Sequence, residues 1–135
     1  MSMDQEYLQW STVYEWANCL SNKGEWNTED MLKLGADKYP AAKWCADHGE
    51  GWYFPSSHEM HLMWDAVSNG THEWDKDYVK LYNDKLDDPI SEDYYWSSNE
   101  TTENMAEVIA FMANSVVCLD PVKTSKFNVR AVHKF

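Results

Sequence analysis

Tyr94-Tyr95-Trp96-Ser97-Ser98 is the stretch that decides the fold, because it opens a series of short apolar and aromatic runs that continues to the C-terminus. Three further runs follow at residues 108–112, 116–119 and 127–132, and polar or turn-forming residues separate them. β-branched and aromatic residues in runs of this length are typical of strands joined by hairpins. The chain from residue 94 onward is therefore predicted to form a small antiparallel sheet.

Helical patterns occupy the chain before that sheet. One lies between Pro40 and Gly49 and is predicted over residues 40–48, since proline favours the first turn of a helix and glycine follows the last. A second begins with Ser56 and Glu59 at capping-box spacing and continues in apolar residues at helical spacing, until an Asn-Gly pair ends it. Helices first and a sheet last predict an α+β fold.

The remaining segments are less regular. Short strands are predicted at 7–10 and 51–55. Residues 12–20 fit either a short helix or a long loop, and a polar connection and a helical turn stopped by Gly35 follow them. The acidic stretch 71–92 predicts a helix or helical turns and then a loop.

Composition limits the partners of the protein. The chain has 135 residues, which fits one domain with a single core, and its formal net charge is -12. That charge repels phosphates and anionic headgroups, so we expect no nucleic acid and no acidic membrane as partner; the plainer role of the acids is solubility. Protein and neutral glycan remain, and the oligomeric state is left open.

The ends of the chain and its hydropathy bear on localisation. No apolar run is long enough to span a bilayer, so no membrane insertion is expected. The first residues have neither the basic start nor the apolar segment of a signal peptide.

We find no residue set for catalysis or for a metal, and expect neither an enzyme nor a cofactor. His58 and His61 are three residues apart, whereas a zinc helix needs histidines four apart. Cys45 and His48 lie one helical turn apart, on an apolar face that is predicted to be buried, where a thiol is inert.

The three cysteines, Cys19, Cys45 and Cys118, allow at most one disulfide and show no C-x-x-C spacing. Cys45 lies on the apolar helix face and Cys118 in an apolar run of the tail. Both are therefore predicted to be buried free thiols.

Five segments form an ordered set, and they are Trp10-Ser11-Thr12, Tyr39-Pro40-Ala41-Ala42 with Cys45, Gly51-Trp52-Tyr53-Phe54-Pro55-Ser56 with Glu59, Tyr94-Tyr95-Trp96-Ser97-Ser98 with Glu100, and Val129-Arg130-Ala131-Val132. Together they resemble the Lcl C-terminal-domain family of bacterial surface and phage proteins, which is related to the variable proteins of diversity-generating retroelements. The resemblance implies one C-type-lectin-like domain over residues 1–135, with two or three helices packed on the sheet. Family members are expected to have a strand before the position of Met1, so the resemblance implies that this chain is trimmed or naturally short at that end. The glycine usual after the position of Phe111 is replaced by Met112-Ala113-Asn114-Ser115.

The resemblance also implies an adhesive or ligand-binding module at a cell surface or on a phage particle, with recognition on the loops and outward strand positions of the tail. The candidate residues are Asn99, Thr101, Thr102, Asn104, Asn114, Ser115, Asp120, Thr124, Ser125 and Phe127. Polar side chains on loops held by a rigid sheet suit recognition, although ordinary hairpin loops have the same composition. Trp26 and Trp74 are predicted to lie in polar loops. Each either stacks on a sugar or a partner protein or anchors its loop. Trp74 is included among the candidate binding residues.

Two further expectations concern charge. Arg130, the only arginine, is expected to pair with Glu59 or Glu100 rather than with a ligand. The Glu-Pro-Asn and Gln-Pro-Asp loops of calcium-dependent lectins are missing from the sequence, so we expect binding without calcium. The expected function is binding of a protein or neutral glycan, and the alternative is a structural or assembly subunit of a pilus tip or phage particle.

Overall fold

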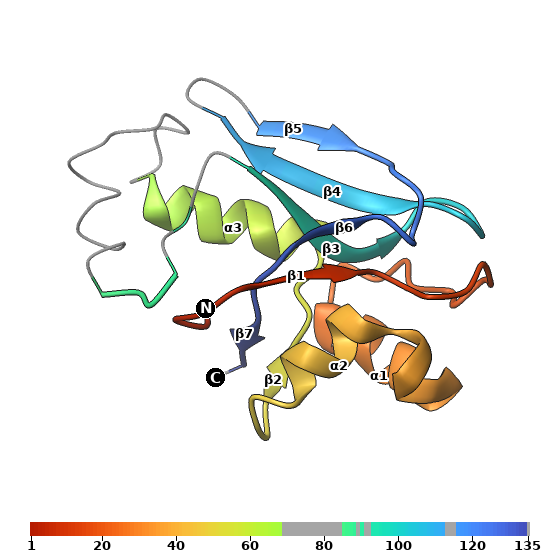
Figure 1. The fold of residues 1–135 in the computed structure, drawn as a ribbon. Coiled ribbons are helices and arrows are strands. Elements are labelled where there is room, and N and C mark those ends of the chain that lie inside the picture. The colour runs from red at the N-terminus through yellow and green to blue at the C-terminus, as the bar shows by residue number, and fades with distance from the viewer. Residues whose placement is uncertain (69–84, 89, 91–92, 113–115, 135) are drawn as a thin grey trace.

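The computed structural model describes residues 1–68, 85–88, 90, 93–112 and 116–134. Within these ranges the fold is α+β, with one five-stranded sheet, one two-stranded sheet and three α-helices. The helices are α1 (Gly24–Gly35), α2 (Pro40–Ala46) and α3 (Ser57–Val67), and a 3-10 turn (Ala36–Lys38) joins the first two. Figure 1 shows α1 and α2 together below the sheet, and α3 alongside β3 and β4.

The larger sheet has the strand order β1-β6-β3-β4-β5. Its strands are β1 (Glu6–Gln9), β3 (Tyr94–Glu100), β4 (Ala106–Phe111), β5 (Val116–Leu119) and β6 (Lys126–Val129). Strands β3, β4 and β5 form an antiparallel meander, after which the chain crosses back and β6 pairs in parallel with β3. The sheet is therefore mixed. The prediction of an antiparallel sheet was wrong for β6, which lies next to β3 and runs parallel to it instead of pairing with β5.

The smaller sheet consists of β2 (Trp52–Tyr53) and β7 (Val132–His133), paired antiparallel. It brings the end of the chain beside α2, which lies far from it in sequence. The helices predicted at 40–48 and from Ser56 onward are confirmed to within two residues at their ends. The four strands predicted in the tail are present, but β3 extends to Glu100, and the strand predicted at 127–132 is divided between β6 and β7.

Alternating side chains of β3 and β4 divide the core between the two faces of the sheet. Tyr95 and Ile109 point to the face that α3 covers, where they pack with Trp64. Trp96 and Val108 belong to a second cluster that reaches the buried residues of α1 and α2. The indole N–H of Trp96 donates to the Leu8 carbonyl at 2.9 Å, which fixes β1 to the sheet while satisfying a buried donor.

The residues before α3 form the predicted capping box. Ser56 accepts a hydrogen bond from the backbone of Glu59, and the Glu59 carboxylate accepts one from the backbone of Ser56. The same carboxylate accepts bonds from the Gly24 N–H at 2.8 Å and from the Tyr53 hydroxyl at 2.7 Å. One half-buried acid therefore joins the starts of α1 and α3 to β2.

Helix α1 begins earlier than the sequence predicted. The segment up to Thr28 was predicted to be a polar connection, yet the helix starts at Gly24 and includes Trp26. The reason is tertiary, because Glu59 supplies an acceptor for the first free N–H of the helix. The indole of Trp26 lies on the exposed face of α1, with the Lys23 ammonium 4.4 Å from its ring centroid.

Two other segments had sequence predictions, at residues 12–20 and 71–92. Residues 12–20 form an extended loop and no helix. The helix or helical turns predicted for 71–92 lie almost wholly outside the described residues.

Replacing Gly24 by alanine tests the close approach of α1 to the start of α3. A Cβ at this position would lie 2.3 Å from the Phe54 carbonyl oxygen and 2.7 Å from the Ser56 nitrogen, both of which belong to the backbone. Helix propensity alone favours alanine by about 1 kcal/mol. We expect Gly24→Ala instead to lower the free energy of unfolding by roughly 1–3 kcal/mol in chemical denaturation. An unchanged or increased stability would contradict the packing described.

Candidate functional site

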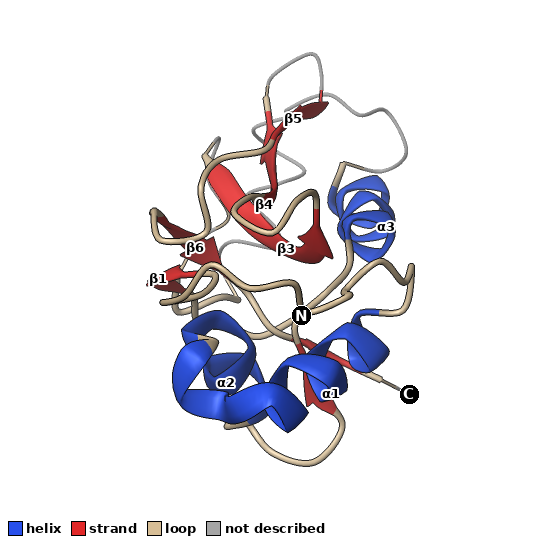
Figure 2. Ribbon diagram, turned by 90° about the vertical axis from the view of Figure 1, so that its right-hand side faces the viewer, coloured by secondary structure: helices blue, strands red, loops and turns tan. Residues whose placement is uncertain are grey.

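Three connections meet at one end of the larger sheet, which we call the loop end: the β3–β4 hairpin at 101–105, the β5–β6 connection at 120–125, and the loop at 11–23. They lie on the right in Figure 1 and face the viewer in Figure 2. The Thr101 hydroxyl donates to the Asp120 carboxylate at 2.6 Å, and the Lys123 N–H donates to the Asn104 carbonyl at 2.9 Å. The loop end is thus cross-linked by its own hydrogen bonds.

The structure brings several of the sequence-predicted binding residues to this end. Thr101, Asn104 and Asp120 are exposed there, and Thr102 is half-buried and accepts backbone hydrogen bonds within the hairpin. Thr124 and Ser125 follow in the β5–β6 connection and are half-buried. Asn114, Ser115 and Trp74 lie outside the described residues.

Two of the candidates serve the fold. The Asn99 side chain accepts from the Ser57 N–H at 2.8 Å and donates to the Ser21 carbonyl at 3.0 Å, which joins β3 to α3 and to the 11–23 loop. Phe127 is half-buried and packs edge-on against Trp96, with ring centroids 5.1 Å apart. Little of either side chain is left to contact a ligand.

Beneath the loop end lies a buried ion pair between Glu100 and Lys123. The Lys123 Nζ is 2.7 Å from the Glu100 carboxylate, and both side chains have no exposed surface. Glu100 also accepts hydrogen bonds from the backbone of Ala17 at 2.8 Å and of Cys19 at 2.7 Å. Lys123 donates a further bond to the Glu15 carbonyl at 2.9 Å, so both ions are compensated by several polar partners.

The hydrogen bonds from Glu100 make the side chains of the 11–23 loop alternate between buried and exposed positions. The side chains of Ala17 and Cys19, whose amides Glu100 binds, point inward and are buried, while those of Trp16, Asn18 and Leu20 are exposed. Sequence reasoning missed these exposed residues as functional candidates, because their apolar spacing fits a helix as well as a loop. Residues 16–20 do not alternate between apolar and polar types, so the sequence carries no local signal for this pattern.

Arg130 does not pair with Glu59 or Glu100, contrary to the sequence expectation. Both acids are occupied elsewhere, as described above. The guanidinium instead donates to the carbonyls of Ser2 and Asp88 and to the Gln5 side chain. Arg130 is 2% exposed, and its burial lowers its pKa. It holds the N-terminal segment in place.

The cysteines offer no reactive thiolate. Cys19 and Cys45 are buried, and that burial raises the pKa of both thiols. Cys118 is exposed, so its predicted burial was wrong: β5 is an edge strand, and both Cys118 and Leu119 at its end are exposed. Among the described residues no three His, Cys, Asp or Glu side chains gather as a metal site.

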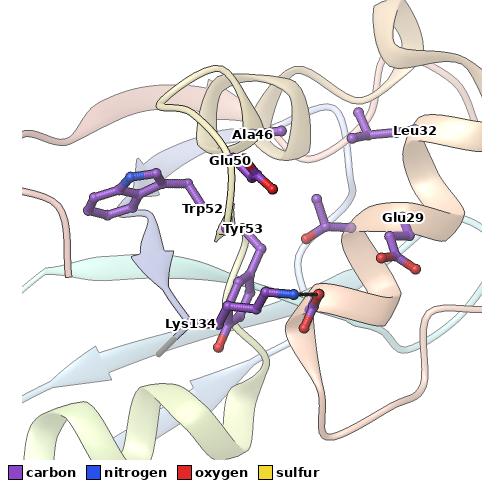
Figure 3. Close-up of a pocket in the computed structure, with 10 residues that line it drawn as sticks. Glu29, Leu32, Ala46, Glu50, Trp52, Tyr53 and Lys134 are labelled. Atoms are coloured by element: carbon purple, nitrogen blue, oxygen red, sulfur yellow. Dashed lines mark hydrogen bonds and ion pairs between the residues drawn. The ribbon is translucent and has the colours of Figure 1, made fainter.

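An acidic pocket of about 190 Å³ lies away from the loop end, between α1 and the β2–β7 sheet. Glu25, Glu29 and Glu50 line it together with Trp52, and Lys134 reaches across it to Glu25 at 2.7 Å (Figure 3). One cation of the chain itself therefore already occupies part of this pocket.

A row of alternating rings lies next to this pocket. Trp44, His48, Trp52 and His133 follow one another with centroid separations of 4.4, 5.4 and 5.2 Å. The His48 ring nitrogens contact the Trp44 carbonyl and the Asp4 carboxylate, each at 2.9 Å. Burial alone would lower the pKa of His48, but the hydrogen bonds to Asp4 and Trp44 outweigh it and raise the pKa above its usual value.

Comparison with solved structures finds a similar fold in a known protein. No protein-family model and no curated protein matches the chain. A solved structure, the crystal structure of a fimbrial protein from Bacteroides ovatus ATCC 8483, matches 96% of this chain with a TM-score of 0.66 and 17% sequence identity. The match covers 34% of the fimbrial protein, so this chain spans about a third of that protein's length. The two share a fold.

Within the described ranges, no helix has the length and apolar character required to cross a bilayer.

The contact between His48 and Asp4 predicts a pH dependence. Because the folded-state pKa of His48 is raised, its stabilising contribution is complete below the unfolded-state value of about 6.5 and is lost as the pH rises through the folded-state pKa. The contribution is at most about 1 kcal/mol, since Asp4 is nearly half exposed. In an NMR titration, Asp4→Asn should lower the titration midpoint of His48, and Asp120→Asn at the loop end should not. Identical midpoints for wild type and Asp4→Asn would contradict the contact.

Proposed function

We propose that this chain is a C-type-lectin-like module for ligand binding or adhesion. It acts outside the cell, at a cell surface or on a phage particle, and binds a protein or a neutral glycan through the loop end. The observation that carries this proposal is the construction of that end, where three connections are cross-linked above a buried ion pair and present exposed polar side chains. A rigid backbone with exposed, adaptable side chains loses little entropy on binding.

Two likenesses support the surface role. The ordered motifs resemble the Lcl C-terminal-domain family of bacterial surface and phage proteins, and the solved structure with a similar fold is a fimbrial protein. The proposal includes membership of that family. The residues of the motifs have structural roles, since Trp96, Glu59 and Glu100 all hold the fold together.

The charge of the loop end agrees with a ligand that is not anionic. Glu103 and Asp120 are exposed there, and the whole chain carries a net charge of -12. Phosphorylated or sulfated partners would meet repulsion over both short and long range. We propose binding without calcium, because calcium needs six to eight oxygen ligands and no acidic cluster occurs within the described part of the loop end.

A role as a structural or assembly subunit is the second candidate. Strands β1 and β5 are the edges of the larger sheet, and they expose Tyr7 (57%) and Leu119 (49%). An uncovered edge with apolar side chains can accept a strand from another chain. Strict monomers at high concentration, measured by size-exclusion chromatography, would weaken this second candidate.

Charge reversal at the loop end tests the binding proposal. Labelled protein is applied to an array of neutral glycans, and extracts of candidate cells are passed over immobilised protein, each with and without EDTA. We expect Asp120→Lys to lower retention of the bound ligand at least about five-fold, since it breaks the Thr101 contact and reverses the local charge.

Asp87→Lys is the matched control, because Asp87 is also an exposed acid and lies in the 85–88 segment at the opposite end of the molecule (Figure 1). It should bind like the wild type. Equal binding by Asp120→Lys, or binding that disappears in EDTA, would refute the loop-end proposal.

A further inference from the structure

A groove of about 360 Å³ lies between the 11–23 loop and the second half of α1. Its lining residues are Trp16, Ala17, Asn18, Asp30, Lys33 and Leu34. Small-molecule sites in proteins have volumes of roughly 300–1,000 Å³, so the groove is at the lower end of that range and fits a single ring. It is a separate surface from the β3–β4 hairpin with Thr101 and from the β5–β6 connection with Asp120.

The loop wall of the groove is fixed from behind by Glu100. The carboxylate binds the amides of Ala17 and Cys19, on either side of Asn18. Asn18 adopts a φ of 62°, in the left-handed region that few residues other than glycine enter and that asparagine tolerates. This conformation directs its side chain outward, and it places Trp16 and Asn18 before any ligand arrives.

The groove offers an aromatic surface beside free polar groups. Trp16 is 46% exposed and Leu34 is 45% exposed. The side chains of Asn18, Asp30 and Lys33 have no hydrogen-bond or ion-pair partner among the residues that the structure describes. An amide, a carboxylate and an ammonium together supply both donors and acceptors.

We propose that this groove binds one pyranose ring of a neutral glycan, an inference that rests on the proposed function and names the ligand class. A pyranose has an apolar C–H face, which matches the exposed indole of Trp16, and a rim of hydroxyl groups, which both donate and accept. Asp30 and Lys33 cancel in charge, so the groove favours a neutral ligand in a chain that repels anions.

A charged peptide suits the same groove less well. Its amine and carboxylate would pair with Asp30 and Lys33, both of which are exposed. Exposed ion pairs contribute only about 0–1 kcal/mol. Solvent weakens these ion pairs, but it does not weaken the burial of the apolar face of Trp16 against a ring. The groove therefore favours a sugar over a charged peptide.

The inference is tested by NMR titration of ¹⁵N-labelled protein with the methyl pyranosides of glucose, galactose, mannose and N-acetylglucosamine. At least one should give saturable shifts of the Trp16 indole N–H and the Asn18 side-chain amide. Trp16→Ala should weaken that binding at least about five-fold, since the stacking surface is lost.

Trp26→Ala is the matched control. Trp26 is 52% exposed on α1, the helix that forms one wall of the groove, but it is not one of the residues that line the groove. It should leave the affinity unchanged. The dispersion of each amide spectrum shows whether the variant is folded, and Trp16→Phe, which keeps an aromatic face, should retain part of the affinity.

Three results would overturn the inference: no saturable shift with any of the four glycosides, a shift that survives Trp16→Ala, or saturable shifts of the same groups with a Lys-Ala-Asp peptide and not with a sugar. The proposed function fails differently. Array binding that is lost in Asp120→Lys and kept in Trp16→Ala would leave the loop-end role standing while it refutes the sugar groove.

Discussion

The ion pair between Glu100 and Lys123 is the interaction on which the loop end depends. Removing two charges from water costs several kcal/mol per ion, and the pair is tolerable only because backbone groups complete its hydrogen bonding. Those groups are the amides of Ala17 and Cys19 and the carbonyl of Glu15. The end of β3, the β5–β6 connection and the 11–23 loop are therefore held together by this one ion pair. None of the three can move without leaving a buried charge uncompensated.

This centre explains how a loop without regular structure presents a defined surface. Binding alternate amides of the loop turns Ala17 and Cys19 inward and leaves Trp16 and Asn18 facing solvent. The half-buried Glu59 has a similar role at the start of α1, where it joins two helix starts and β2. Glu100 thus positions the loop wall of the groove, and Glu59 fixes the start of the helix that forms the other wall.

Sequence reasoning predicted the features whose causes are local. The strands of the tail and the capping box at Ser56 follow from short-range patterns, and they are present. It failed where the cause is distant. Helix α1 begins at Gly24 because Glu59 lies beside it, 35 residues further along the chain. Lys123, in a polar connection, has no local sign that it is buried, and the apolar run around Cys118 does not reveal that its strand is an edge.

Hydrogen exchange of the amides at residues 17–19 tests the account most directly. If Glu100 binds the amides of Ala17 and Cys19 as described, both should exchange only through openings as rare as those of β3 and β4. The amide of Asn18 has no acceptor among the described residues and should exchange rapidly between them. Rapid exchange at all three positions, with β3 and β4 still protected, would contradict the claim that the buried ion pair fixes this loop.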